Sequence, residues 1–335
     1  MMDIPTMRLS DRLKELLKEA EGREVTLDGL RKELQIDPTC DEQGRSSWST
    51  LRSLMSRYAK MKLVTPSGRK DGVYKVVKQV KPVQVVGRKS SPPKTVYFPR
   101  DRGTEMEMDF AEDLVLRPGD LILLSGTSNA GKTALALNFL AENLDDHPVI
   151  MGNEYCTIDG EARPRIINAV EAMDWVEWAD DEGQRFTLLP VMEDYAEHIV
   201  KDKINIIDWI NLEEHYNISR VMEGIKKELG NGIAIIAIQK AQGALAGRGG
   251  QFTKDFADVE MLLDLYGEKE TILKLGKVKE ARSKVLGRTF AYGIENGVYI
   301  KNFREIYRCK YCRGQGFRGT KPCTECYNGY IEGVF

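Results

Sequence analysis

The sequence of 335 residues lacks any apolar run long enough to cross a bilayer. Its first 17 residues are charged and helical in period, without the apolar stretch of a secretory leader. Only six cysteines are present: four crowd between Cys309 and Cys326, whereas Cys40 and Cys156 stand alone. That distribution suits a metal site in a reducing compartment better than a disulfide scaffold. We therefore expect an intracellular protein of the cytoplasm (the host cytoplasm if the chain is viral), with no membrane partner.

Acidic residues are nearly missing from one part of the chain. Residues 51–100 contain thirteen Lys and Arg against a single acid, Asp71, although the net charge of the whole chain is only −2. A basic block of this kind favours a polyanionic partner, whereas a solvated surface is the commoner explanation of a single charge run. The length of the chain indicates two or three domains.

The first eighty residues predict a small helical domain. Apolar periodicity places helices over residues 9–20, 26–34 and 47–61, and a β-hairpin with a basic tip follows over 63–77. Three helices followed by a hairpin resemble a winged-helix domain, in which the third helix enters the DNA major groove. A protein-interaction domain with a basic face is the alternative. The candidate contacts to nucleic acid are Arg45, Arg52, Arg57, Arg69 and Lys70, and duplex DNA is the partner expected for this domain. Residues 81–104, rich in Pro and Ser, are expected to form a linker.

Residues 126–133 match the pattern of a phosphate-binding loop, Gly, any four residues, Gly-Lys-Thr. The loop consists of Gly126, Thr127, Ser128, Asn129, Ala130, Gly131, Lys132 and Thr133. The glycines let backbone N–H groups approach phosphate oxygens, Lys132 adds positive charge, and the Thr133 hydroxyl can bind Mg²⁺. A buried strand over 121–124 leads into the loop and a helix over 133–143 leads out, so the helix points its positive end at the phosphates of ATP.

Beyond the loop, strands and helices alternate, which predicts an α/β domain with a mostly parallel sheet. The strand over 148–151 leads to Glu154, a candidate to polarise the attacking water, although an ordinary solvated acid is the alternative. A second strand over 204–207 ends in Asp208, a candidate Mg²⁺ ligand. A third, over 233–238, ends in Gln239, which could sense a γ-phosphate. A helix is expected over 192–202, and strands over 259–265, 271–278, 288–294 and 298–300.

The glycine-rich stretch 241–253 contains Arg248 and is expected to be a long loop. Long loops in compact domains are often functional. We weigh two interpretations equally here: a DNA-contacting loop ordered by the nucleotide, and a mobile surface loop.

Together these residues resemble the RecA-like ATPase core of DnaB-type replicative helicases and, more loosely, the RecA, RadA and KaiC group. The resemblance spans about residues 105–300, within an ATPase domain expected over 105–304. It is carried by 116–123, 131–138, the segment Asp255-Phe256-Ala257-Asp258-Val259, and Arg282 with Gly287. It implies that Lys132 and Thr133 bind phosphate and Mg²⁺ with Asp208, that Glu154 is the catalytic base, and that Gln239 is a sensor. Arg282 would then act as a finger in a neighbouring subunit's site, beside Lys132 there. Where the family has Lys two residues before the finger, this chain has Glu280.

The resemblance implies a DNA-dependent ATPase that forms a hexameric ring or a filament and moves on single-stranded DNA. A recombinase-like or loader ATPase, which assembles on DNA without unwinding it, is one alternative. A DNA-binding regulator switched by ATP is another.

The last 31 residues, 305–335, predict a zinc module. Two C-x-x-C pairs, Cys309 with Cys312 and Cys323 with Cys326, can supply four thiolates to one tetrahedral Zn²⁺. The run Cys312-Arg313-Gly314-Gln315-Gly316 resembles the repeat of the DnaJ cysteine-rich region, whereas the second half departs from it at Asn328-Gly329. We expect a structural zinc. Nucleic-acid contact through the module's cations and the docking of a protein both remain open.

Overall fold

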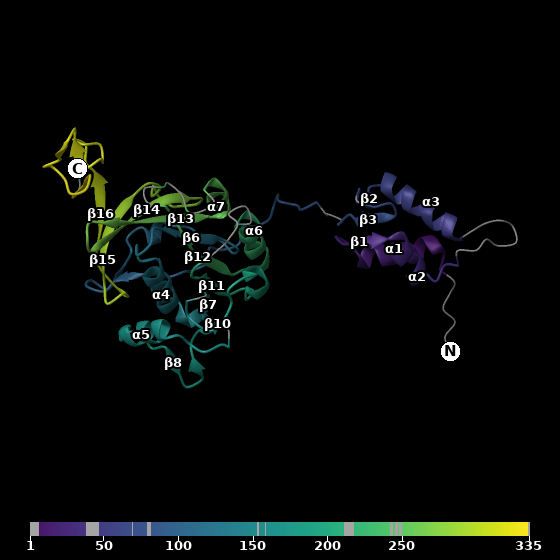
Figure 1. The fold of residues 1–335 in the computed structure, drawn as a ribbon, viewed down its shortest axis with the longest axis horizontal. Helices are drawn as coiled ribbons and strands as arrows, with labels where there is room; N and C mark the ends of the chain where they lie inside the picture. Colours follow the sequence, from purple (N-terminus) through teal and green to yellow (C-terminus); the bar gives the residue numbers. More distant parts are fainter. Residues whose placement is uncertain are drawn as a thin grey trace. The chain divides into compact units, whose positions relative to one another are not determined.

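The computed structural model describes residues 7–37, 47–68, 70–78, 82–152, 154–157, 159–210, 218–241, 244, 247 and 250–333. The chain divides into two compact units, Met1–Lys89 and Ser90–Phe335. Figure 1 shows both as ribbons. Each unit has its own apolar core, so each is considered by itself.

The first unit packs three helices against a small antiparallel sheet. The helices are α1 (Leu9–Glu19), α2 (Leu27–Glu33) and α3 (Ser47–Lys60), and the strands are β1 (Glu24–Thr26), β2 (Val64–Pro66) and β3 (Val73–Val76), in the order β1-β3-β2. Leu13, Leu51 and Met55 are fully buried between them. The Thr26 hydroxyl accepts a hydrogen bond from the Gly29 N–H at 2.9 Å and so caps α2. The three helices and the hairpin predicted from the sequence are confirmed, and β1 is an additional strand.

The second unit is built on one ten-stranded sheet. Six parallel strands come first, in the spatial order β10 (Thr187–Leu189), β7 (Val149–Met151), β11 (Ile204–Ile207), β12 (Ile233–Gln239), β6 (Leu121–Gly126) and β13 (Val259–Tyr266). Four antiparallel strands continue it: β14 (Glu270–Val278), β15 (Thr289–Glu295), β16 (Tyr299–Arg308) and β19 (Tyr330–Glu332). This confirms the predicted α/β fold class with a mostly parallel central sheet.

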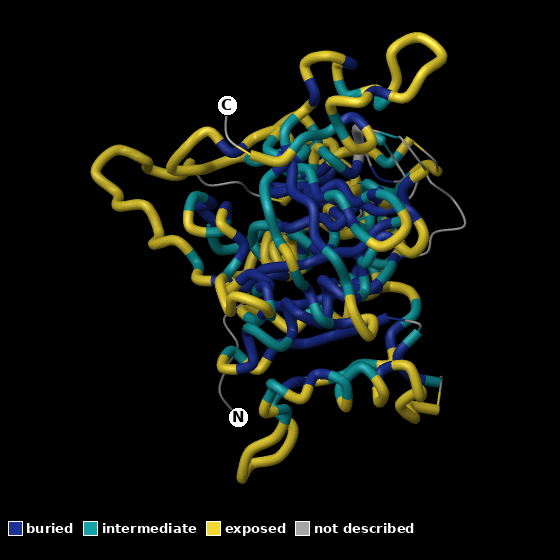
Figure 2. The backbone as a smooth tube through the Cα atoms, turned by 90° about the vertical axis from the view of Figure 1, so that its left-hand side faces the viewer, coloured by how far each residue is buried: buried dark blue, intermediate teal, exposed yellow. Residues whose placement is uncertain are grey.

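Helices cover both faces of the parallel part of the sheet. Ile122 and Leu124 of β6 belong to the same apolar cluster as α4 (Lys132–Glu142), whereas Leu121 and Leu123 belong to the cluster of α6 (Ile218–Glu228). Because side chains alternate along a strand, a continuous apolar run is what a strand buried on both faces requires. Figure 2 shows the backbone coloured by burial, with buried residues in dark blue.

Part of the segment expected to form a linker packs against the second unit. Val96 and Phe98 are buried in its core, and the Phe98 ring lies 5.1 Å from that of Phe139 and 5.8 Å from that of Phe110. Two short strands follow, β4 (Arg100–Asp101) and β5 (Met106–Glu107), and then the 3-10 helix η1 (Ala111–Asp113). Residues 94–104 therefore belong structurally to the sheet domain.

Some elements differ from those expected. The helix predicted over 192–202 is wrong: only the short 3-10 helix η3 (Tyr195–His198) forms there, and Asp194 has a left-handed φ of 50°, which a helix cannot continue through. The strand expected at 298–300 runs on to Arg308, and β19 pairs with its end, so the sheet extends into the cysteine segment. The last part of the expected loop 241–253 enters the short helix α7 (Gln251–Phe256).

The remaining elements are small or lie at the edges. They are η2 (Leu144–Asp146), α5 (Pro164–Ala172), β8 (Ala179–Asp180), β9 (Gly183–Gln184), β17 (Phe317–Arg318) and β18 (Lys321–Pro322). Within the described ranges, no helix is both long enough and apolar enough to cross a membrane.

Candidate nucleotide site and four-cysteine cluster

The phosphate-loop sequence forms the turn between β6 and α4, as predicted. Gly131 has a φ of +77°, and a Cβ there would lie 2.2 Å from Cδ1 of Ile294. A Cβ at Gly126 would lie 2.8 Å from Cγ of Lys132. At Gly131 the backbone conformation favours glycine, because L-residues rarely adopt it, and at Gly126 a Cβ would displace the Lys132 side chain.

The Lys132 ammonium lies inside this loop. Its Nζ donates to the carbonyl oxygens of Thr127 at 2.8 Å and Gly126 at 3.1 Å, and to Oε1 of Gln239 at 3.3 Å. Burial lowers the pKa of Lys132, while the carboxylates of Asp208 and Glu154 oppose that shift. The predicted phosphate ligand and the predicted sensor are therefore in direct contact.

Asp208 lies at the end of β11 and is 1% exposed. Its Oδ2 accepts a hydrogen bond from the Tyr155 hydroxyl, whereas Oδ1 is buried without a hydrogen-bond partner among the described residues. Burial raises the pKa of Asp208, against the opposing effect of the Tyr155 and Thr133 hydroxyls. A buried carboxylate oxygen that lacks a donor, beside a Thr hydroxyl, matches the hard oxygen ligands that Mg²⁺ prefers. The donor set thus fits a magnesium ion.

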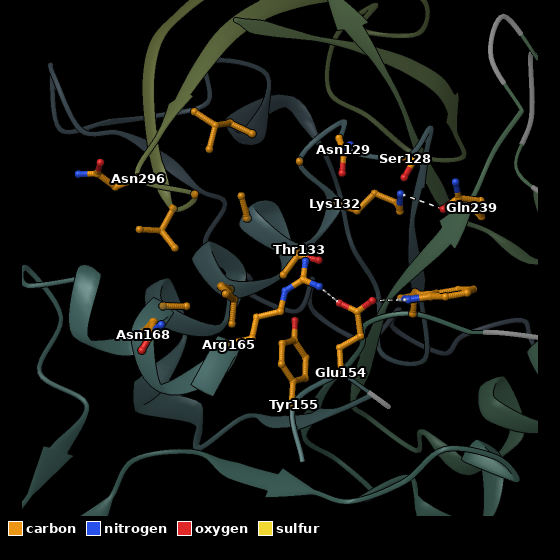
Figure 3. Close-up of a pocket in the computed structure, with 18 residues that line it drawn as sticks. Ser128, Asn129, Lys132, Thr133, Glu154, Tyr155, Arg165, Asn168, Gln239 and Asn296 are labelled. Carbon is orange, nitrogen blue, oxygen red and sulfur yellow. Dashed lines mark hydrogen bonds and ion pairs between the residues drawn. The ribbon is translucent and has the colours of Figure 1, made fainter. Parts of the chain in front are cut away.

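Glu154 is held by two donors from other parts of the fold. Arg165, near the start of α5, forms an ion pair with Glu154 Oε2, and Nε1 of Trp209 donates to Oε1 at 3.3 Å. Figure 3 shows Glu154 and Arg165 facing the space beside Lys132 and Gln239. The predicted base is consequently oriented by a partner on each of its oxygens.

These groups line one cavity of about 680 Å³. Its walls come from the phosphate loop and α4, from Glu154 and Tyr155, from α5, and from the turn between β15 and β16. The lining residues are Ser128, Asn129, Gly131, Lys132, Thr133, Ala134, Leu137, Glu154, Tyr155, Arg165, Asn168, Ala169, Trp209, Gln239, Ile294, Asn296, Gly297 and Val298. Of the other predicted loop residues, Ala130 is fully buried and Thr127 is nearly so.

Arg165, Asn168, Trp209 and Asn296 were missed by sequence reasoning. Trp209 follows Asp208 directly, so its proximity could have been anticipated. Arg165 and Asn168 lie one turn apart on a helix with no motif, and Asn296 lies in a strand turn distant in sequence. These residues line the cavity only because α5 and the β15–β16 turn pack against the phosphate loop.

Arg282 does not reach the cavity of its own chain. It is exposed after β14, its backbone N–H donates to the Asp113 carbonyl at 2.7 Å, and its guanidinium donates to the Glu112 carbonyl. The nearby Lys279 N–H bonds to the Asp258 carbonyl, and the Asp258 N–H bonds to Leu121, where β6 begins. Arg282 therefore lies toward the opposite end of β6 from the phosphate loop, roughly 17 Å away along the strand.

The segment Asp255–Val259 connects the start of β13 with the start of β6. The Asp258 carboxylate is buried and accepts hydrogen bonds from the Leu121 N–H at 2.9 Å, from Lys279 Nζ at 2.8 Å and from Lys226 Nζ. Although burial opposes the shift, the two ammonium groups hold the pKa of Asp258 below its ordinary value. Lys279 thus has a structural partner, and Glu280 forms an ion pair with Arg117.

Comparison with known proteins adds a distant likeness in fold. A solved structure of a KaiC-like protein from the hyperthermophilic archaeon Pyrococcus horikoshii OT3 is 17% identical in sequence, with a TM-score of 0.44, and covers 62% of this chain and 100% of that chain. No protein-family model matches the sequence. No curated protein matches it either. Such a likeness assigns neither an activity nor a partner.

Two of the candidate nucleic-acid contacts line one groove of the first unit. Arg52 on α3 and Lys70 near the hairpin turn both line a groove of about 720 Å³, together with Trp48 and Tyr74. Arg57 is exposed in the last turn of α3. Three further candidates, Arg45, Arg69 and Arg248, lie outside the described residues.

The four predicted zinc ligands converge. Their Sγ atoms all lie within 4.8 Å of one another, with Cys309 and Cys323 separated by 4.0 Å and Cys312 and Cys326 by 3.5 Å. Tetrahedral bonds of 2.3 Å imply sulfur separations of about 3.8 Å, so the cluster has the dimensions of a Zn²⁺ site.

The backbone supports the same cluster. The Gly316 N–H donates to Cys312 Sγ at 3.3 Å, which favours a thiolate. A Cβ at Gly329 would lie 2.3 Å from the Gly314 carbonyl oxygen, so a glycine is required where the two C-x-x-C halves touch. This contact gives a physical reason for the glycine at position 329, whereas nothing in the contact explains Asn328.

Proposed function

We propose that this chain is a Mg²⁺-dependent ATP hydrolase, stimulated by DNA, that works as a homo-oligomeric, helicase-like motor. One observation carries the proposal: Lys132, Glu154 and Gln239, which come from three separate segments, line a single cavity at the phosphate loop beside the buried Asp208. A purely structural glycine turn would not gather a cation, two carboxylates and an amide at one end of a sheet.

Each residue then has a defined task in hydrolysis. The loop N–H groups and Lys132 bind the phosphate oxygens, and Glu154 accepts a proton from the water that attacks the γ-phosphorus as the bond to the ADP oxygen breaks. Thr133 and Asp208 would hold Mg²⁺, which neutralises charge on the phosphates when it is bound. Arg165 and the Trp209 N–H orient the Glu154 carboxylate toward the cavity.

The first experiment measures ATP turnover with and without single-stranded DNA. We expect Mg²⁺-dependent hydrolysis that DNA accelerates and that Lys132→Ala abolishes. Turnover that no nucleic acid stimulates would reject the motor. A strand-displacement assay then separates a helicase from a recombinase-like or loader ATPase, because only the helicase releases the displaced strand.

The position of Arg282 supports a site shared between subunits. Its guanidinium is exposed and distant from its own cavity, where a finger for a neighbour has to lie. We expect Lys132→Ala and Arg282→Ala each to be inactive alone. Mixing them should restore turnover, because roughly a quarter of randomly formed interfaces would pair an intact loop with an intact arginine. A mixture as inactive as its components would exclude this role for Arg282.

The first unit supports a second contact with DNA, through duplex. Arg52, Lys70 and Trp48 share one groove between the third helix and the hairpin, the place where a winged helix meets its site. Binding of the full chain to labelled duplex should weaken in Arg52→Glu, whereas Arg12→Glu, on α1, should bind duplex as the unmodified chain does. Strong sequence-specific binding with negligible ATP turnover would instead favour a regulator switched by ATP.

A further inference from the structure

The cysteine cluster presents exposed aromatic rings among cations. Tyr311, between Cys309 and Cys312, is 52% exposed, and Phe317, in β17, is 55% exposed. Six exposed residues of this module are together called the knuckle surface: Arg308, Tyr311, Arg313, Phe317, Arg318 and Lys321. A single exposed ring is ordinary on a protein surface, whereas here two rings and five cations occur within residues 308–321.

The charged side chains of this module are mostly cationic. Residues 308–327 contain five Lys and Arg and one acid, Glu325, so the net charge stays positive, at +2, when a zinc ion with four thiolates contributes −2. Arg308, Arg313, Arg318 and Lys321 form no ion pair with any acid in the described part of the chain. By contrast Arg304, just before the module, pairs with both Glu270 and Glu332. The cations of the knuckle surface are thus available to an external anion.

The small hairpin of β17 and β18 adds a second, independent observation. Its register places Arg318 directly opposite Lys321. Like charges at directly opposed positions of an antiparallel pair repel each other and destabilise the hairpin. A bound polyanion would neutralise this repulsion, whereas no acidic residue in the described part of the chain does.

We propose that the knuckle surface binds single-stranded nucleic acid. The cations match the phosphates, and the two rings match the exposed faces of unpaired bases, which stack on aromatic side chains without regard to sequence. A duplex buries its base faces, so it would leave Tyr311 and Phe317 without partners. An acidic peptide would satisfy the cations but would not require planar rings.

The module is attached firmly to the nucleotide domain. The Tyr266 ring at the end of β13 packs edge-on against Tyr327 at 5.2 Å and Tyr330 at 6.1 Å, and its hydroxyl donates to the Tyr327 carbonyl at 3.2 Å. Three residues before Tyr266, the Leu263 carbonyl accepts the Thr127 N–H of the phosphate loop. A strand bound at the knuckle surface is consequently held by the unit that carries the nucleotide cavity. The inference does not depend on ATP hydrolysis.

The test uses the full chain carrying Lys132→Ala, without nucleotide, and a fluorescent oligo-dT of twenty residues. Replacing both Tyr311 and Phe317 by Ala should weaken binding by about 25-fold or more, since each stacked base contributes a factor of roughly five or above. Tyr97→Ala is the matched control, because Tyr97 is 47% exposed on the same unit but outside the knuckle surface. Its affinity should be unchanged.

Two further readouts locate the contact. The double variant Arg318→Ala, Lys321→Ala should reduce the slope of log affinity against log salt by about 1.4, as expected for two phosphates of a single strand. Bromodeoxyuridine oligonucleotides should crosslink at Tyr311 or Phe317. Metal analysis must show one zinc per chain in every variant.

The proposal is overturned if the ring variants retain full affinity with zinc bound. It is equally overturned if duplex of the same length, or poly-glutamate, suppresses the crosslink at Tyr311 and Phe317 as well as unlabelled oligo-dT does. A protein that fails to hydrolyse ATP but passes these tests would refute the proposed motor and leave the knuckle surface intact.

Discussion

Gly152 follows β7 and lies against the backbone of Asp208. A Cβ at this position would lie 1.9 Å from the Asp208 carbonyl oxygen and 2.8 Å from its carbonyl carbon. Both obstructing atoms are backbone, so no side-chain rotation can relieve the overlap. We therefore predict that Gly152→Ala displaces either the end of β7 or the strand end that carries Asp208.

The size of the effect follows from the distances. Bringing the oxygen contact from 1.9 Å to 3.0 Å requires a movement of 1.1 Å. Overpacking of this kind typically lowers the free energy of unfolding by about 1–3 kcal/mol. A displacement of about 1 Å in a catalytic group costs about a hundredfold in rate. We expect the alanine variant to remain folded at 25 °C but to hydrolyse Mg²⁺-ATP at about one hundredth of the unmodified rate.

The assay is steady-state ATP turnover at several Mg²⁺ concentrations, with thermal unfolding measured on the same samples. Gly293→Ala is the control: a Cβ there meets only the Lys301 carbonyl oxygen at 3.8 Å, an ordinary contact. It should hydrolyse ATP normally. Unmodified turnover and stability in Gly152→Ala would refute the assigned contact between the two strand ends and, with it, the placement of Asp208.

Three other predictions concern separate parts of the unit. Arg165→Ala should lower ATP turnover at least tenfold, because Glu154 loses an orienting partner. The free energy of unfolding should change by less than about 1 kcal/mol, since the ion pair is half exposed. Turnover and chemical denaturation, measured on the same samples, check both expectations. Burial raises the pKa of Glu260, so its carboxyl group binds a proton more tightly in the native state than in the unfolded chain. The free energy of unfolding therefore falls as the pH rises from 4.5 through the raised pKa of Glu260. Glu260→Gln should remove this fall and melt above the unmodified protein at pH 8, with no difference near pH 4; parallel melting curves at all pH values would contradict it. Cys309→Ser should lose the bound zinc while retaining nucleotide binding, as metal analysis and titration with a fluorescent ATP analogue would show.

Local patterns predicted much of the second unit. The motif of the phosphate loop and the apolar run before it predict a turn between a buried strand and a helix, and the loop forms there between β6 and α4. Asp208 and Gln239 each end a buried strand, and parallel strands bring their carboxyl ends to one edge. The contact between Gln239 and Lys132 is the outcome of that rule.

What the sequence did not reveal depends on packing between distant segments. Arg165 reaches Glu154 because α5 packs beside the phosphate loop, and no local pattern reports such a neighbour. Val96 and Phe98 lie in a segment rich in Pro, whose composition favours a linker, yet their apolar side chains fill the core beside Phe139. The helix expected at 192–202 failed because the periodicity does not reveal the left-handed conformation of Asp194.

Strand β16 begins beside the turn that lines the nucleotide cavity and ends one residue before Cys309. Its ten residues span roughly 30 Å and are held laterally by β15 and β19. An extended strand held in this way resists stretching along its axis, unlike a loop or hinge. Tension on the zinc module, as from a stretched polymer bound there, would therefore act on the wall of the nucleotide cavity through this one strand, in which Asn302, with a φ of 56°, is the irregular position.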